Sequence, residues 1–144
     1  FLITQAVGRT MIERKRGVII NIASDVGVIS PDWRIYEPDP ESGYEGVPFN
    51  TPIHYSMTKT AVIGMTRHLA THWARHNIRV NALSIAGMYK NQDKAFVERL
   101  SRLIPLGRMA QQYEYKGAIV FLASDASSFM TGANLIVDGG RTCW

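Results

Sequence analysis

Short apolar runs rich in β-branched residues alternate along this chain with longer stretches that have helical periodicity. The runs occupy residues 18–22, 78–83 and 135–137. Runs of this length predict strands, and their continuous apolar character favours strands buried on both faces, as in a parallel sheet. Because parallel strands require crossover connections, the intervening helical stretches indicate βαβ units with right-handed crossovers. The order of elements therefore predicts an α/β fold with about three parallel strands and flanking helices.

Four stretches carry the three-and-four spacing of apolar residues that is typical of amphipathic helices. They span residues 1–15, 53–75, 93–103 and 112–123. The longest helix is predicted to have a stripe of Val62, Met65, Leu69 and Trp73, and the last helix a stripe of Tyr115, Ile119 and Leu122. We expect the first helix to end at Gly17 and the longest one to stop at Asn77, since both residue types are common at helix ends.

Residues 30–52 differ in composition from the rest of the chain. They hold five of the six prolines together with the aromatic residues Trp33, Tyr36, Tyr44 and Phe49. This composition predicts a long loop, and loops of this length inside compact domains are usually functional or disordered. The aromatic residues argue against plain disorder.

The 144 residues are 46% hydrophobic and 19% charged, which is sufficient for a packed core in one domain or part of one. No apolar run approaches the roughly 20 residues that span a bilayer, and no signal segment opens the chain, so we expect no membrane partner. The single cysteine, Cys143, excludes an internal disulfide and is consistent with a cytoplasmic location. The chain opens on Phe1 with the pattern of a helix interior, so we expect it to be part of a larger protein.

Sixteen Lys and Arg residues against twelve Asp and Glu residues give a net charge of +4. The densest cluster, residues 14–16, lies at the predicted end of a helix, where cations favour the negative end of the helix dipole. Nucleic-acid binding requires a concentrated basic face with aromatic or glycine residues between the cations. The charge pattern therefore predicts no nucleic-acid partner.

Three histidines, His68, His72 and His76, recur every four residues and would share one stripe of the longest helix. Two histidines at this spacing can bind zinc. A stripe of three along one helix cannot close around a single ion, and no Glu or Cys lies beside them at ligand spacing. We therefore expect no metal site, and surface or subunit-interface positions for these residues.

The strongest local signal for chemistry is the segment Tyr55-Ser56-Met57-Thr58-Lys59. Tyr and Lys four residues apart lie on one face of a helix. A free phenol has a pKa of about 10, and a nearby ammonium lowers that pKa because it stabilises the phenolate. Such a pair can act as a general acid or base. Many helices contain the pair by chance, so the spacing alone is weak support.

Ser24 ends the first predicted strand. In open parallel sheets, ligands bind beyond the carboxyl ends of the strands, so its hydroxyl could donate a hydrogen bond to a reacting carbonyl or alcohol oxygen. The alternative is a turn residue that bonds to the local backbone. Ser24 lacks the Gly-x-Ser-x-Gly elbow and a paired histidine, which argues against a hydrolase.

Taken together, these features resemble the short-chain dehydrogenase/reductase superfamily over the whole chain. The matching segments, in the family's order, are TQAV, GVIINIASDVG, YSMTK, IRVNALS, PLGRM, FLASDASSFMTG and LIVDGG. The resemblance implies the C-terminal part of a Rossmann-like, doubly wound parallel sheet. It also implies hydride transfer between NAD or NADP and a carbonyl/alcohol pair. In the family's scheme Tyr55 is the acid/base, Lys59 binds the nicotinamide ribose and lowers the Tyr pKa, and Ser24 orients the substrate.

The sequence departs from the family in three places. The glycine-rich phosphate-binding segment, the strand that selects NAD or NADP and the Asn of the catalytic tetrad are absent from these 144 residues. The loop that contacts the nicotinamide in the family has Ile85 and Ala86 in place of Pro-Gly, followed by Gly87 and Met88, and loss of the rigid turn could crowd the ring. Ser24 and Tyr55 lie 31 positions apart, well beyond the family's usual spacing, because residues 30–52 intervene. This segment resembles an insertion in a subgroup associated with nucleotide-sugar and surface-polysaccharide metabolism.

Two functions from different classes remain open. The first is an NAD(P)-dependent oxidoreductase for a small carbonyl or alcohol, sugar-related substrates included, which forms homo-oligomers. Because the phosphate-binding loop is absent, we expect the isolated 144 residues to be inactive or poorly active. The second is a catalytically silent half-Rossmann module held by self-association, since an exposed strand edge at residues 18–22 would favour dimers or swapped assemblies.

Overall fold

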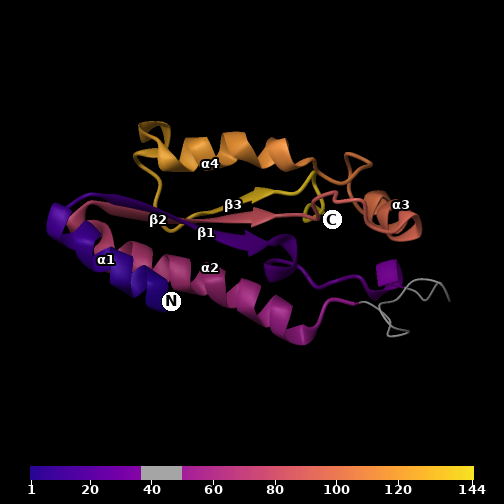
Figure 1. The fold of residues 1–144 in the computed structure, drawn as a ribbon, viewed down its shortest axis with the longest axis horizontal. Helices are drawn as coiled ribbons and strands as arrows, with labels where there is room; N and C mark the ends of the chain where they lie inside the picture. The colour runs from indigo at the N-terminus through magenta and orange to yellow at the C-terminus, as the bar shows by residue number, and fades with distance from the viewer. Residues whose placement is uncertain (37–49) are drawn as a thin grey trace.

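Three parallel strands form the sheet, and helices cover both of its faces (Figure 1). The computed structural model describes residues 1–36 and 50–144. The strands are, in spatial order, β1 (Gly17–Ser24), β2 (Ile78–Ile85) and β3 (Asn134–Val137). Both pairings, β1 with β2 and β2 with β3, are parallel. This arrangement confirms the predicted α/β fold with three parallel strands.

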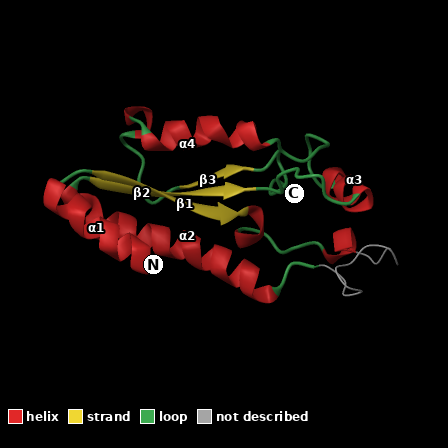
Figure 2. Ribbon diagram, in the orientation of Figure 1, coloured by secondary structure: helices red, strands yellow, loops and turns green. Residues whose placement is uncertain are grey.

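The helices are divided between the two faces of the sheet. In Figure 1, α1 (Leu2–Arg14) and α2 (Ile53–Trp73) lie below the strands and α4 (Lys116–Ala123) lies above them. The short α3 (Lys94–Arg102) lies beyond the arrowheads of the strands, as Figure 2 also shows. Short 3-10 helices complete the elements: η1 (Asp25–Gly27), η2 (Trp33–Tyr36), η3 (Ala74–His76), η4 (Gln112–Tyr115) and η5 (Asp125–Ser127). None of the helices in the described ranges has the length and apolarity needed to cross a membrane.

The central strand and the edge strand differ in burial. In β2, Val80, Ala82 and Leu83 are completely buried. In β1 most positions are half-buried, and Ile22 is 43% exposed. The prediction of burial on both faces is therefore correct for β2 and wrong for β1. The reason is that β1 is an edge strand, which pairs only with β2 among the described residues and leaves its other edge open, as the sequence also predicted.

The helix ends differ in how well the sequence predicted them. The predicted helix at residues 1–15 agrees with α1 to within one residue at each end, but Lys15 and not Gly17 terminates it, because Lys15 adopts left-handed backbone with a φ of 51°. Its N–H then bonds back to the last turn, which is the usual way for a left-handed residue to end a helix. Gly17 is instead the first residue of β1. Asn77 has a φ of 56° directly after η3, which confirms the predicted stop.

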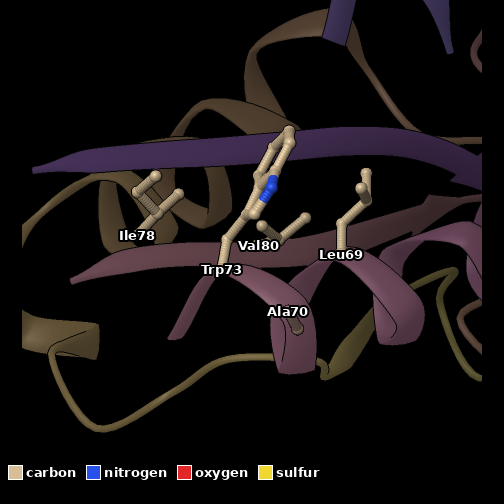
Figure 3. Packing of buried hydrophobic residues seen from close by; sticks show 5 residues of the cluster. All are labelled: Leu69, Ala70, Trp73, Ile78 and Val80. Carbon is tan, nitrogen blue, oxygen red and sulfur yellow. The ribbon is translucent and has the colours of Figure 1, made fainter. Parts of the chain in front are cut away.

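The apolar core between α2 and the sheet is built from Leu69, Ala70, Trp73, Ile78 and Val80. Figure 3 shows Leu69 and Trp73 extending from α2 toward the strands, with the side chains of β2 beside them. Met65 packs against this cluster. The predicted stripe of α2 is thus correct at three positions and misses three further buried residues, Ile63, Thr66 and Ala70.

The last predicted helix is shorter than its pattern indicated. Residues 112–115 form the 3-10 turn η4, and the α-helix begins at Lys116. Tyr115 and Leu122 are buried as predicted, whereas Ile119 is 41% exposed. The change from a 3-10 turn to an α-helix shifts the angular position of later residues, which explains why one member of the stripe leaves the core.

Candidate functional site

A cavity of about 510 Å³ opens where the strands end at their carboxyl termini. We call it the carboxyl-end cavity. Its walls come from the end of β1, the loop after β2, the start of α2 and residues of α3, and they include Ser24, Tyr55, Ile85, Tyr36, Phe96 and Arg141. The volume falls within the range of small-molecule sites. The position agrees with the general rule that open parallel sheets bind ligands at this edge.

Ser24 and Tyr55 lie on the wall of this one cavity although 31 positions separate them in sequence. Ser24 is the last residue of β1 and is buried. Tyr55 lies in the first turn of α2 and is 41% exposed. A partly exposed phenol and a buried hydroxyl thus face the same small volume. This is the juxtaposition that the sequence predicted for a reacting oxygen.

A close backbone contact sets the distance between the Ser24 segment and α2. A Cβ atom placed on Gly27 would lie 2.9 Å from the Lys59 carbonyl carbon, so any larger residue would collide with helix backbone. The Thr60 hydroxyl donates a hydrogen bond of 3.3 Å to the Gly27 carbonyl. The turn that follows Ser24 therefore packs directly on the helix that carries Tyr55.

Lys59 connects α2 to the end of β1 and lies beside the phenol. Its Nζ donates a hydrogen bond of 3.0 Å to the Ile22 carbonyl, and the same Nζ lies 5.6 Å from the centroid of the Tyr55 ring. The hydrogen bond fixes the ammonium at the edge strand. A cation at this distance favours negative charge on a neighbouring group.

Asp25 is a buried acid next to Ser24 that the sequence prediction missed. Its Oδ1 accepts hydrogen bonds from the Ser24 hydroxyl at 2.8 Å and from the Val26 N–H at 2.9 Å. Burial raises the pKa of the Asp25 carboxyl, while these two hydrogen bonds and the charge of Arg141 oppose the rise. Asp25 also lines the cavity. The signal available in the sequence was the acid that directly follows Ser24 in GVIINIASDVG.

The loop after β2 lines the cavity with Ile85, Ala86, Gly87 and Met88. Its backbone is held without the Pro-Gly turn of the family pattern. The Tyr115 hydroxyl donates a hydrogen bond of 3.0 Å to the Ala86 carbonyl, and Met88 forms a β-bridge with Ala110. Burial raises the pKa of Tyr115 to about 12, so this donor keeps its proton across the physiological range.

Part of the predicted loop at residues 30–52 also faces the cavity. Trp33 and Tyr36 lie in η2, and the Tyr36 ring packs against Phe96 of α3 with a centroid distance of 5.7 Å. The Tyr36 and Thr51 hydroxyls share a hydrogen bond. The other two aromatic residues of the prediction, Tyr44 and Phe49, lie outside the described residues.

The histidine stripe and the cysteine lie away from this cavity. The His68 and His72 rings stack with a centroid distance of 6.1 Å, and His76 accepts a hydrogen bond from Arg75. Within residues 1–36 and 50–144, no group of three or more His, Cys, Asp or Glu side chains is arranged to hold a metal ion. Cys143 is exposed.

The groups present in the cavity fit the reacting end of a nicotinamide cofactor. The Tyr55 phenol, the Ser24 hydroxyl and the loop at residues 85–88 line this space, and the Lys59 ammonium lies beside the phenol, 5.6 Å from the centroid of its ring. The loop carbonyl at Ala86 is already engaged with Tyr115, so its backbone presents a fixed surface. The sequence holds no glycine-rich turn opening a helix, which is how a pyrophosphate is commonly bound.

The fold is that of Rossmann-like α/β proteins, and comparison with known proteins identifies the family. A family model described as "Enoyl-(Acyl carrier protein) reductase" matches residues 42–142. The chain is 37% identical over 150 residues to galactitol 2-dehydrogenase of Rhizobium johnstonii, covering 100% of this chain and 52% of that protein. The chain belongs to the short-chain dehydrogenase/reductase superfamily.

Solved structures agree with this assignment. A short-chain dehydrogenase from Leptospira borgpetersenii with bound NAD+ matches with a TM-score of 0.87 and 37% identity, over 99% of this chain and 51% of that one. A gluconate 5-dehydrogenase from Burkholderia cenocepacia in complex with NADP and tartrate matches with a TM-score of 0.79 and 35% identity, over 98% of this chain and 51% of that one. The chain thus spans about half the length of the relatives it matches.

Proposed function

We propose that this chain is the catalytic half of an NAD(P)-dependent oxidoreductase that interconverts an alcohol and a carbonyl. One observation carries the proposal: Ser24 and Tyr55 share one cavity, and the Lys59 ammonium lies 5.6 Å from the Tyr55 ring. The family assignment supports the same chemistry. We propose residues 1–144 as a partial domain of this family, with residues 30–52 as an insertion between the Ser and Tyr motifs.

In the proposed reaction the Tyr55 hydroxyl exchanges a proton with the substrate oxygen. For carbonyl reduction it donates the proton, and for alcohol oxidation its phenolate accepts one. Lys59 stabilises the phenolate through its charge, and the Ser24 hydroxyl donates a hydrogen bond to the substrate oxygen. Since that hydroxyl donates to Asp25 in this structure, it has to rotate toward the cavity to do so. The chemistry that a nicotinamide supplies when bound is transfer of the hydride at the carbonyl carbon.

The proposed cofactor contacts are Tyr55, Lys59 and the loop residues Ile85, Ala86, Gly87 and Met88. Support comes from the position of Tyr55 and the loop residues around one cavity, from the Lys59 ammonium beside the Tyr55 ring, and from structural neighbours bound to NAD+ and to NADP. The cofactor is therefore proposed as NAD or NADP. The isolated chain is proposed to be inactive or poorly active, because it lacks a glycine-rich phosphate-binding turn.

The proposed substrate is a small polyhydroxylated alcohol or its carbonyl form. The relatives' names concern a sugar alcohol, galactitol, and a sugar acid, gluconate, which favours such compounds over the nucleotide sugars suggested by the insertion. A cavity of about 510 Å³ is sufficient for a six-carbon chain beside the reacting end of a cofactor. We also propose a cytoplasmic protein, with neither a membrane nor a nucleic acid as partner.

A second function, self-association as a catalytically silent module, is favoured by the open edge of β1. Within the described residues this edge has no neighbouring strand, and Ile22 is 43% exposed there. Unpaired strand edges promote pairing between chains. Homo-oligomer formation is compatible with either function.

Titration of the chain with NADH and NADPH, followed by cofactor fluorescence, distinguishes the two functions. Saturable binding in the micromolar range, with slow oxidation of galactitol or gluconate when NAD+ or NADP+ is supplied as the hydride acceptor, would support the oxidoreductase and contradict the silent module. Absence of binding, combined with a dimer or larger species in light scattering, would contradict an autonomous enzyme. If the gene encodes residues ahead of Phe1, the same titration on the longer product tests the proposed dependence on a phosphate-binding segment.

A further inference from the structure

A buried arginine forms part of the wall of the carboxyl-end cavity. Arg141 is 8% exposed, and its Nε has no hydrogen-bond partner in the described part of the chain. An unpaired buried donor is costly, and a charged one more so. Arg141 also lines a neighbouring cavity of about 570 Å³, which it shares with residues 29–34 and Trp144. Its guanidinium thus stands between two spaces that are large enough for a small ligand.

The turn that precedes Arg141 holds the residue in this place. The two carboxylate oxygens of Asp138 accept hydrogen bonds of 2.8 Å from the Gly140 and Thr142 N–H groups. Gly139 and Gly140 have φ angles of 66° and 90°, a backbone conformation that side chains disfavour. The position of Arg141 is therefore fixed by the local backbone before any ligand arrives.

The acids near Arg141 already have other partners. Burial raises the pKa of Asp25 and the Arg34 hydrogen bond lowers that of Asp32; the charge of Arg141 opposes the first shift and adds to the second, so Arg141 lies within electrostatic range of both acids. Asp32 forms an ion pair of 2.6 Å with Arg34, and Asp25 accepts the hydrogen bond from the Ser24 hydroxyl. Arg141 belongs to none of the ion pairs in residues 1–36 and 50–144. The guanidinium therefore remains able to accept a carboxylate from outside the chain.

We propose that Arg141 forms an anion subsite that binds a carboxylate group of the substrate, so that the site favours polyhydroxy acids over neutral polyols. The inference rests on the proposed function, because it places the carboxylate in the cavity that Ser24 and Tyr55 line. A guanidinium binds a carboxylate through two parallel hydrogen bonds. A single buried guanidinium matches one negative charge, whereas a doubly charged phosphate ester would also face Asp25 and Asp32.

A matched pair of ligands tests the subsite without cofactor. D-Gluconate and D-glucitol have the same carbon chain and differ at C1, which is a carboxylate in one and a primary alcohol in the other. We expect gluconate to shift the Arg141 Nε–H resonance of the ¹⁵N-labelled chain in NMR titrations, and glucitol at equal concentration to leave it unchanged. A gluconate titration that leaves this resonance in place would overturn the proposal.

Two variants separate the subsite from general electrostatic attraction. Arg141→Gln is expected to weaken gluconate binding roughly tenfold or more, the effect of losing a hydrogen-bonded charge pair. Lys90→Gln removes an exposed cation that lines the same cavity and is expected to change binding less than about threefold. Arg141→Lys keeps the charge without the planar fork and should recover only part of the affinity. Equal losses in the Arg141→Gln and Lys90→Gln variants would contradict a built subsite.

The anion subsite and the proposed oxidoreductase function can be contradicted independently of each other. A chain that binds gluconate through Arg141 but never transfers hydride would overturn the oxidoreductase and retain the subsite. A chain that oxidises both ligands equally, with or without Arg141, would retain the oxidoreductase and overturn the subsite. If Arg141→Gln fails to fold, as judged by circular dichroism, the resonance shifts of the unaltered chain decide.

Discussion

The two ends of the sheet are comparably buried but differ in how their side chains are satisfied. At the amino end of β2, Leu69, Trp73 and Val80 form a purely apolar cluster (Figure 3). At the carboxyl end, the buried polar groups Ser24, Asp25, Asp138 and Arg141 lie beside a second apolar cluster, which consists of Ile35, Leu100, Ile104 and Met109. The buried side-chain atoms without hydrogen-bond partners in the described ranges, Ser56 Oγ and Arg141 Nε, belong to residues near this second end.

Polar burial in itself does not distinguish the two ends. Asn81 and Ser84 are completely buried in the middle of β2, yet each has a partner: Asn81 donates to the Met130 carbonyl at 2.8 Å and Ser84 donates to Asn134 at 2.7 Å. What distinguishes the carboxyl end is that its buried polar groups border a cavity. The Arg141 Nε lacks a hydrogen-bond partner there, and the Ser24 hydroxyl can rotate away from Asp25. Unsatisfied or rotatable polar groups beside a cavity are typical of sites that bind and react, so we expect that capacity at the carboxyl end of the strands.

Replacing Tyr55 should give the largest effect on activity and a negligible one on stability. In a form of the protein that has measurable activity, Tyr55→Phe is expected to lower kcat roughly 10²- to 10⁴-fold, because it removes the proposed proton donor. The rate is followed through NADH absorbance. Tyr113→Phe, at a tyrosine that is 66% exposed, is the matched control and should retain full activity. Unchanged turnover in Tyr55→Phe would contradict the acid/base assignment.

Replacing Trp73 should have a large effect on stability and a small one on the catalytic groups. Trp73→Ala deletes the largest side chain of the apolar cluster and is expected to lower the free energy of unfolding by about 3–5 kcal/mol. Urea unfolding followed by circular dichroism measures the loss. Trp33→Ala, at a tryptophan that is 56% exposed, should cost far less. Similar losses for the two variants would mean that the cluster does not dominate stability.

Two glycines, one in tight contact with α2 and one in an open position within α2, sharpen the comparison. Gly27→Ala would force a methyl group against the Lys59 backbone, with an expected cost of about 1–3 kcal/mol and a lowered kcat as Ser24 moves. Gly64→Ala, inside α2 with no atom within 4 Å of its Cβ position, should stabilise by about 0.5–1 kcal/mol. Thermal unfolding of both variants gives the sign of each change in stability. A neutral Gly27→Ala would show that the Ser24 turn can move away from α2.

The smallest expected effects concern two acids of opposite pKa shift. Burial raises the pKa of Asp25 above its usual 3.8, so this residue disfavours the folded state as pH rises through that raised pKa. The pKa of Asp32 is lowered to about 2 by its hydrogen bonds with Arg34, so its stabilisation is present above pH 3.8 and is lost as pH falls toward 2.

The two acids therefore give opposite slopes in a plot of melting temperature against pH. Asp25→Asn should remove a decline that sets in as pH rises above 3.8, and Asp32→Asn should remove a decline that sets in as pH falls below 3.8. Both differences should amount to no more than a few degrees. Identical profiles for the two variants would contradict the assigned directions of the pKa shifts.

The sequence predicted the features that depend on local pattern. The order of strands and helices, the stop at Asn77 and the proximity of Ser24 to Tyr55 follow from periodicity, motif and the geometry of parallel sheets. The edge character of β1 limits the burial of Val18 to Ile22, and that burial depends on which strands are neighbours. Lys15 ends α1 in place of Gly17, because backbone conformation at a helix end depends on more than residue type.

The roles of Asp25 and Arg141 could not be predicted in the same way. Arginine is rarely buried, and the burial of Arg141 depends on the turn that Asp138 holds at the end of β3. Similarly, nothing in the local pattern distinguishes the buried Asp25 from the half-buried Asp32. Both residues acquire their properties from segments that are distant in sequence.

The contacts of Gly27 and Lys59 have a consequence for how such a chain can diversify. These two contacts join the Ser24 turn and the β1 end directly to α2, so packing, and not only the connecting chain, aligns Ser24 with Tyr55. Doubling the length of a connecting segment costs only about 0.6 kcal/mol in loop-closure entropy. Insertions between Ser24 and Tyr55 should therefore change the stability of the fold little. Such insertions can add new substrate-recognition surfaces without altering the positions of the two reacting groups.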